Sequence, residues 1–262
     1  MMTEPGLLRS SLLHAGRVLR GARRTPLLVV QSLMFPAVLL VMFELVLSRS
    51  LMAFAPGRDA GELVALIVII ATVFGALVSG SGLFDEREAG LLARFTTVGS
   101  HAGSMLLGRV MAEVARVVCA SVVLLLIGWA FGMSVHTGSL GVLAFFGVLA
   151  VIAATVGMAI STLAVTGATR SGLNLLAPVF LVLMFFNSGF APIESFPSVV
   201  APVVRFLPFT VGVDTLLWCL RGGPVPIWTP LLLAGWCVLV VALSGWLWAT
   251  RAQARISGER TG

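Results

Sequence analysis

Six stretches of the chain are almost entirely apolar, and their lengths restrict what the chain can fold into. A helix needs about 20 mostly apolar residues to cross the hydrocarbon core of a bilayer. The stretches are residues 27–47, 63–84, 110–131, 140–165, 173–190 and 229–249, of which the fifth is the shortest. We therefore predict an all-α integral membrane protein, with one transmembrane domain over residues 1–262 and six transmembrane helices.

The composition agrees with a bilayer environment. Apolar residues make up 58% of the chain and charged residues 11%, whereas a soluble domain of this size has too little interior to bury so many apolar side chains. The net charge of +6 does not indicate nucleic-acid binding, because the arginines are spread between the apolar stretches rather than clustered. Lysine is absent while alanine, glycine and valine are abundant, which indicates a GC-rich bacterial genome.

The arginines also predict the orientation, because basic residues concentrate on the cytoplasmic side of a membrane. With the N-terminus inside, twelve arginines fall on the cytoplasmic side, and only Arg49, Arg58, Arg205 and Arg221 fall on the other. We expect a multi-pass protein of the bacterial plasma membrane with both termini in the cytoplasm. Leu8, Leu12, Ala15 and Leu19 recur at helical spacing, so residues 1–26 are expected to form an interfacial helix on the inner leaflet. The alternative is a basic segment that only anchors the orientation.

Residues 191–228 are too apolar for an ordinary exposed loop but hold six of the twelve prolines. Proline removes a backbone donor and breaks helices, so a continuous span is disfavoured. We predict two short re-entrant helices that dip into the outer leaflet and return, and that close a substrate exit. Glu194 is expected to fix the first turn through backbone hydrogen bonds. The alternatives are a packed extracellular cap and a solvated Glu194.

The cytoplasmic segment 85–109 begins with an acidic run and continues with apolar residues at helical spacing. Acidic residues at the start of a helix suit its dipole, and Leu91, Leu92 and Phe95 would form one apolar face. Such a short amphipathic helix is suited to a groove on a partner protein. A solvated loop that only marks topology remains the alternative.

Several chemistries are excluded or disfavoured. A chain without lysine cannot contain the phosphate-binding loop that ends in Gly-Lys-Ser/Thr, so it binds no ATP in that way. His14, His101 and His136 lie on separate segments and form no metal motif. We expect no cofactor, no metal site and no catalytic residues in this chain, and we expect its three cysteines to be packing residues.

Three ionisable residues lie within the apolar stretches. Glu44 is near the outer end of the first stretch, where it is expected to reach the interface as an anchor. Glu113 and Arg116 stand three residues apart near the inner end of the third stretch, so we expect them to pair with each other.

Three motifs resemble the ABC-2 type permeases, specifically their daunorubicin-resistance-like branch. Residues 85–90 (DEREAG), closed by residues 107–109 (LGR), are similar to the family's coupling-helix loop. Residues 187–197 (NSGFAPIESFP) resemble its signature after the fifth span, and residues 207–210 (LPFT) with Asp214 and residues 220–222 (LRG) resemble the segment that follows. The likeness covers nearly the whole chain.

The resemblance implies a half-transporter of an exporter for hydrophobic drugs or envelope lipids, without an ATPase site of its own. Its partners would be a separate ATP-binding-cassette ATPase, which binds ATP and Mg, a second permease that is a copy or a relative, and membrane lipids, but no nucleic acid. The implied ATPase-coupling residues are Asp85, Glu86, Arg87, Glu88, Gly90, Leu91 and Phe95. The implied extracellular gate residues are Phe190, Pro192, Glu194, Pro197, Pro208, Asp214 and Arg221.

Two other classes of function are weighed against this one. A proton-coupled secondary transporter would need buried carboxylates and an internal repeat, neither of which the sequence offers. A membrane assembly scaffold without catalysis is the second alternative.

Overall fold

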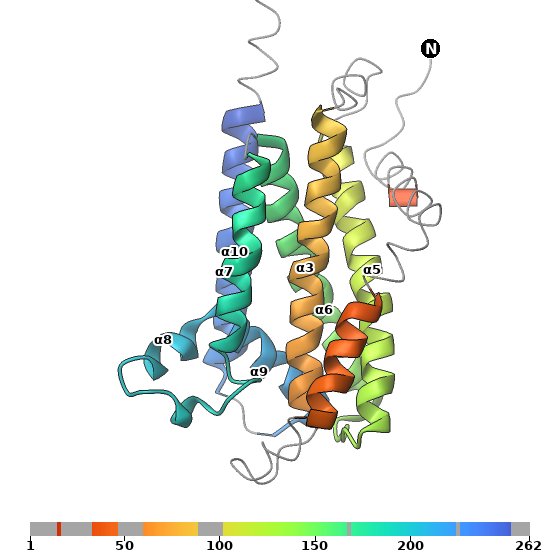
Figure 1. The fold of residues 1–262 in the computed structure, drawn as a ribbon, viewed down its shortest axis with the longest axis vertical. Coiled ribbons are helices and arrows are strands. Elements are labelled where there is room, and N and C mark those ends of the chain that lie inside the picture. Colours follow the sequence, from red (N-terminus) through yellow and green to blue (C-terminus); the bar gives the residue numbers. More distant parts are fainter. Residues whose placement is uncertain are drawn as a thin grey trace, which may run out of the picture.

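The computed structural model describes residues 15–16, 33–46, 60–88, 102–166, 169–223 and 226–252. Within these residues the chain is helical and contains no strand, so the all-α class is confirmed (Figure 1). The helices are Leu33–Val46, α3 (Ala60–Glu88), α5 (Ala102–Ala130), α6 (Gly138–Thr166), α7 (Arg170–Phe185), α8 (Ala201–Phe206), α9 (Pro208–Arg221) and α10 (Trp228–Leu247). A 3₁₀ turn, η1 (Ile193–Ser195), precedes α8, and a π-helical turn, η2 (Trp248–Ala252), follows α10.

Four of the described helices are long and apolar enough to cross a membrane: Ala60–Glu88, Leu106–Ala130, Gly138–Thr166 and Trp228–Arg251. They coincide with four of the six predicted stretches. The other two stretches contain the shorter apolar helices Leu33–Val46 and Leu175–Phe185. Of the expected interfacial helix over residues 1–26, only Ala15 and Gly16 are described, and both are helical.

Of the long helices, α3, α6 and α10 run in one direction along the bundle and α5 runs in the other (Figure 1). Arg109 and Arg116 of α5 contact the carbonyls of Ser79 and Ala71, so α5 runs antiparallel to α3. Arg87 at the end of α3 reaches the carbonyl of Ala164 near the end of α6, so these two helices are parallel. We call the two ends of the bundle the Ala60 end and the Glu88 end, after the first and last residues of α3.

The core of the bundle lies between α3 and α6. Helix α3 packs against α5, α6, α7 and α9, and α6 packs against α3, α5, α9 and α10. Consequently the part of α3 nearest the Ala60 end is buried on all sides, including Leu66, Ile67 and Ile70. A helix that is apolar all round is typical of such a central position.

Helix α9 is buried among the long helices although it is too short to cross the bundle. Its residues Thr210, Val211, Leu216 and Leu220 are each at most 1% exposed. Gly212 allows the close approach to α3, because a Cβ there would lie 2.8 Å from Cδ1 of Ile69. Small residues bring membrane helices together in this way.

Candidate functional site

Charged residues at the Glu88 end connect three helices. Glu86, in the last turn of α3, forms an ion pair with Arg109 of α5 at 2.8 Å, and Arg109 also donates to the carbonyl of Ser79 at 3.0 Å. Arg87 donates to the carbonyl of Ala164 on α6 at 3.0 Å, and its guanidinium lies 5.3 Å from the ring centre of Phe84. The ends of α3, α5 and α6 are therefore joined beside the segment that links α3 to α5.

The structure differs here from the sequence-based expectation. Asp85, Glu86, Arg87 and Glu88 form the last turn of α3 rather than the start of a separate helix. Acidic side chains are unfavourable at a helix C-terminus, and the ion pair between Glu86 and Arg109 offsets part of that cost. Gly90, Leu91 and Phe95, the other expected coupling residues, lie outside the described residues.

At the Ala60 end, the chain leaves α7 through a turn built by Asn187. The Asn187 side chain is fully buried. Its Nδ2 donates to the carbonyl of Met184, and its Oδ1 accepts from the backbone N–H groups of Gly189 at 2.8 Å and Phe190 at 3.1 Å. The amide thus pairs one carbonyl that the end of α7 leaves free with two N–H groups of the following turn, and it fixes the direction in which the chain continues.

The predicted gate residues that follow lie near this turn. The ring of Phe190 meets Phe43 and Phe185 edge to face, at centroid distances of 6.2 and 5.2 Å. Pro192 precedes the 3₁₀ turn η1, and Pro197 follows it.

The expectation for Glu194 is wrong. Its carboxylate is exposed and makes no hydrogen bond to the described backbone. The turn is closed instead by Ser195, whose N–H and Oγ both donate to the carbonyl of Pro192, at 2.9 and 2.6 Å. The Ser195 hydroxyl can donate to the Pro192 carbonyl, whereas the Glu194 carboxylate can only accept and lies exposed.

The segment between α7 and α10 starts and ends at the Ala60 end but reaches well into the bundle. Trp236 donates to the carbonyl of Phe206 at 3.1 Å, and Trp236 lies eight residues into α10, about 12 Å along its axis. Gly212 contacts Ile69, nine residues into α3, which is about 14 Å along that helix. Pro208 begins α9 at this depth, where its missing N–H costs nothing.

The C-terminal end of α9 is fixed at the Ala60 end. Arg221 forms an ion pair with Glu62 of α3 at 3.1 Å. The Thr137 hydroxyl contacts the carbonyls of Cys219 at 2.6 Å and Leu220 at 3.0 Å, and the backbone N–H of His136 also donates to the carbonyl of Leu220. The last carbonyls of α9 are therefore bonded to the connection between α5 and α6.

Asp214 links α9 back to the turn after α7. Its Oδ1 accepts a hydrogen bond from the Ser188 hydroxyl at 2.5 Å. Burial raises the pKa of Asp214 above its ordinary value, and the bond from Ser188 opposes that rise.

Asp214 and Arg221 were predicted gate residues, whereas Asn187, Ser188, Thr137 and Glu62 were not assigned roles. Only the motif spacing around Asn187 and Ser188 offered a signal for them.

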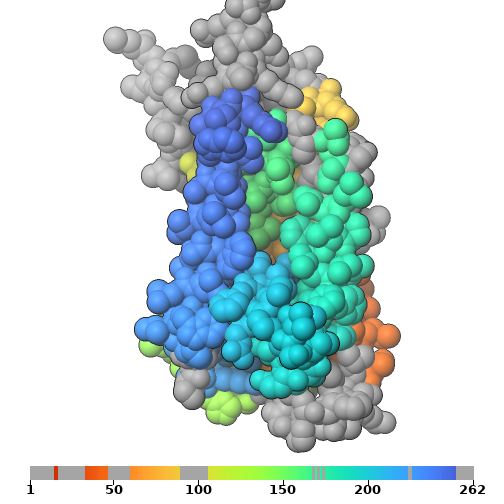
Figure 2. Space-filling model, turned by 90° about the vertical axis from the view of Figure 1, so that its left-hand side faces the viewer, coloured from red at the N-terminus to blue at the C-terminus, as the bar shows by residue number. Residues whose placement is uncertain are grey.

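Figure 2 shows that the surface is hollowed between α10 and α7, above the α8–α9 segment, with α6 behind. The packing agrees with this view, because α10 lies against α6 and α9 while α7 lies against α3. The rings of Phe180 on α7 and Phe209 on α9 are 6.0 Å apart and connect α7 to the inner end of α9.

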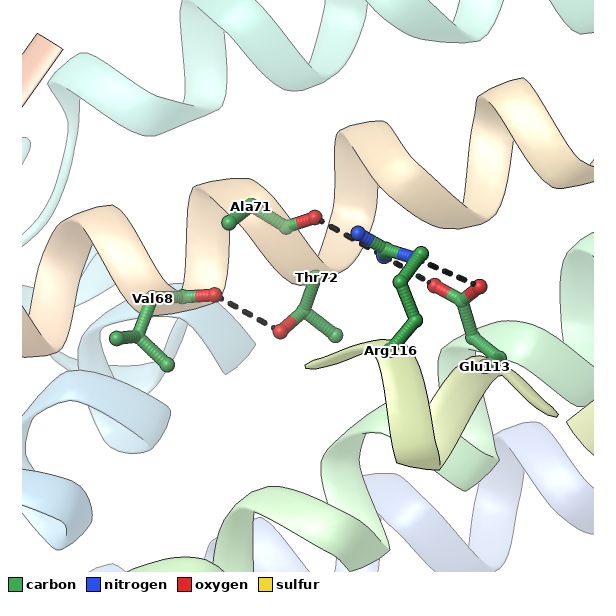
Figure 3. Close-up of polar contacts among 5 residues, drawn as sticks. All are labelled: Val68, Ala71, Thr72, Glu113 and Arg116. Atoms are coloured by element: carbon green, nitrogen blue, oxygen red, sulfur yellow. Dashed lines mark hydrogen bonds and ion pairs between the residues drawn. The ribbon is translucent and has the colours of Figure 1, made fainter. Parts of the chain in front are cut away.

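The predicted pair of Glu113 and Arg116 is confirmed, at the level of the bundle centre (Figure 3). Because α5 begins eight residues before the predicted stretch, Arg116 is the central residue of the helix, fourteen residues from each end. It donates to both carboxylate oxygens of Glu113, at 2.5 and 3.1 Å, and to the carbonyl of Ala71 on α3 at 3.3 Å. Glu113 is 5% exposed.

The remaining ionisable and metal-binding candidates of the described chain form no further site. Glu44 is 6% exposed, so its side chain is buried within the protein rather than exposed at its surface as an interfacial anchor would be. The described part of the chain contains no group of three or more His, Cys, Asp or Glu residues arranged to hold a metal ion. Its three cysteines are free thiols.

Comparison with known proteins covers most of the chain. A sequence model of the family described as ABC-2 type transporter matches residues 13–220. The chain is also similar to the probable doxorubicin resistance ABC transporter permease protein DrrC of Mycobacterium tuberculosis, in strains CDC 1551/Oshkosh and ATCC 25618/H37Rv. In both cases the identity is 26% over 238 residues, which is 87% of this chain and 84% of the relative.

Proposed function

The chain belongs to the ABC-2 type transporter family, and we propose that it is the permease of an exporter for hydrophobic or amphiphilic molecules, powered by a separate ATPase. The observation that carries the proposal is the extent of the family match, which includes both the charged Glu88 end and the segment after α7. The relatives are permeases named for doxorubicin resistance. A drug or an envelope lipid is therefore the substrate class we propose.

We propose six membrane crossings, made by the four long helices together with the helices that contain Leu33–Val46 and Leu175–Phe185. The two shorter segments are apolar and coincide with predicted stretches. An even number of crossings keeps the arginine-rich ends of the chain on one side, in the cytoplasm of a bacterial cell. The Glu88 end then faces the cytoplasm and the Ala60 end faces outward.

In this orientation α8 and α9 are re-entrant helices of the outer leaflet, and α9 closes the exit. The support is their reach of about 12 to 14 Å from the Ala60 end. The hollow between α7 and α10 leads to this segment (Figure 2). Bonds from Glu62 and Thr137 hold the C-terminal end of α9 in the closed arrangement.

At the cytoplasmic face, the coupling site of the proposed ATPase comprises the end of α3 and the residues that follow it. Asp85 and Glu88 are exposed in the last turn of α3, and Leu91 and Phe95 would provide the apolar side of the contact. ATP and Mg would bind to the ATPase subunit alone. A second permease, identical or related, would complete the translocation path.

Transport into inside-out vesicles tests this function against its rival. The permease is produced with an ATP-binding-cassette ATPase from the same genome, and doxorubicin is the probe. The expected result is ATP-dependent uptake that disappears when the phosphate-loop lysine of the ATPase is replaced. Uptake that persists with the inactive ATPase and stops when a protonophore is added would identify a proton-coupled secondary transporter instead.

A further inference from the structure

The ion pair at the bundle centre is too costly to be explained by stability. Charged side chains in the middle of a membrane helix are expensive, and a buried ion pair is often no more stabilising than two apolar side chains of similar size. Glu113 and Arg116 nevertheless occupy this place in α5, with Glu113 almost completely buried. Such residues are therefore candidates for a part in the transport cycle.

Neighbouring helices provide space for both side chains. The guanidinium of Arg116 lies against Gly75 of α3, where any Cβ would overlap its Cζ, Nη1 and Nη2 atoms. On the other side, a Cβ at Gly157 of α6 would lie 3.2 Å from Cγ of Glu113. Because Gly75 has no side chain, the carbonyl of Ala71 one turn earlier is open to Arg116. The pair thus fits between α3 and α6.

Arg116 forms the second of two similar connections between α5 and α3. Arg109 donates to the carbonyl of Ser79 at the Glu88 end, and Arg116 donates to the carbonyl of Ala71 near the centre. The two arginines are seven residues apart, about 10 Å along α5, and the two carbonyls are eight residues apart, about 12 Å along α3. Two connections at different depths hold α3 and α5 in a fixed register.

We propose that Glu113 and Arg116 are positioning residues for transport, which make α3 and α5 move as one rigid hairpin. A displacement at the Glu88 end, where the ATPase acts, would then reach the contact between Ile69 of α3 and Gly212 of α9. This inference rests on the proposed function. A pair that served only to neutralise two charges would not need its contacts with α3.

Substitutions on α3 and α5 separate these two roles. Gly75→Ala keeps both charges and displaces the guanidinium from α3, and Gly82→Ala is its matched control, since a Cβ there meets nothing within 4 Å. Arg116→Lys keeps the charge but loses the planar fork that serves Glu113 and Ala71 together. The double variant Glu113→Arg/Arg116→Glu keeps a pair but moves the guanidinium to the position that faces Gly157.

The reporter is Cys219 of α9, in a chain whose Cys119 and Cys237 are replaced by serine. Cys219 is 4% exposed, and burial raises the pKa of its thiol, so it reacts slowly while α9 is packed. The permease–ATPase complex in lipid nanodiscs is treated with a small maleimide, with and without an ATP analogue that is not hydrolysed. Co-purification and ATP hydrolysis are measured on the same samples.

We expect the analogue to change the Cys219 reaction rate roughly tenfold in the parent chain and in Gly82→Ala, a typical size for coupling between two sites. Gly75→Ala, Arg116→Lys and the double variant should lose this change while they still bind the ATPase and hydrolyse ATP. If the analogue changes the Cys219 reaction rate equally in Gly75→Ala and in Gly82→Ala, the inference about Glu113 and Arg116 is wrong, while the proposed function is unaffected. If Gly75→Ala does not assemble with the ATPase, Arg116→Lys and the double variant are compared with Gly82→Ala in the same way. No analogue effect in the parent chain would contradict the proposed function as well.

Discussion

The carboxyl of Asp214, which accepts a hydrogen bond from Ser188, makes the stability of the protein depend on pH. Burial raises the native pKa of Asp214 above its ordinary value of 3.8. Between 3.8 and the native pKa, the folded state keeps a proton that the unfolded state has lost. Stability therefore falls as the pH rises through this window and becomes constant above the native pKa.

The variant Asp214→Asn should remove that dependence, because an amide does not titrate but its oxygen still accepts from Ser188. Thermal unfolding of the purified protein in detergent, followed from acidic to neutral pH, measures the effect. We expect the variant to be more stable than the parent at neutral pH and equally stable at the acidic end. Glu194→Gln, at an exposed carboxylate, is the control. Identical pH profiles for Asp214→Asn and the parent would contradict the assignment.

The sequence indicated which polar side chains take part in contacts better than it indicated the groups that they contact. The pairing of Glu113 with Arg116 follows from helical spacing, so it could be predicted. The contacts of η1 could not be predicted, since the Glu194 carboxylate needs a backbone N–H and the Ser195 hydroxyl can use a carbonyl, and the sequence does not show which of these lies within reach. Glu44 was misplaced for a similar reason, because the sequence does not tell which face of a helix is buried.

Among the helices, the lengths of the apolar stretches predicted the positions of α3, α5, α6 and α10 well. Helix ends were less predictable. α3 continues through Glu88 because Glu86 and Arg87 find partners on α5 and α6, far away in the sequence. α7 ends at Phe185, before the end of its apolar stretch, because Asn187 turns the chain there.

The end of α9 allows a prediction about a single ion pair. Glu62 and Arg221 join the first turn of α3 to the last turn of α9, and both side chains are partly buried, at 15% and 24% exposure. Glu62→Gln and Arg221→Gln should each speed amide hydrogen exchange in the last turns of α9. In the double variant the two effects should not add, with a coupling energy of about 1 kcal/mol. Additive effects would show that the pair does not hold α9.

At the scale of the whole molecule, the orientation in the membrane leads to a labelling prediction. Single cysteines are introduced at Ser198, next to η1, and at Gly258, in a chain without its native cysteines. With six crossings and both termini inside, the cysteine at 198 should react with an impermeant reagent on intact cells, and the one at 258 only after lysis. Labelling of position 258 on intact cells would refute the six-crossing topology and the gate.

The proposed function makes transport dependent on a separate ATPase, and co-purification with that ATPase tests this dependence. The permease is co-expressed with the ATP-binding-cassette ATPase used in the vesicle assay and purified through a tag on the permease, as the parent chain and as Leu91→Asp. A charge at Leu91 should cost several kcal/mol in an apolar groove. We expect the parent to retain the ATPase and to hydrolyse ATP only in its presence, while Leu91→Asp inserts but loses the ATPase. Specific ATP binding by the permease alone, or normal ATPase retention and transport in Leu91→Asp, would contradict it.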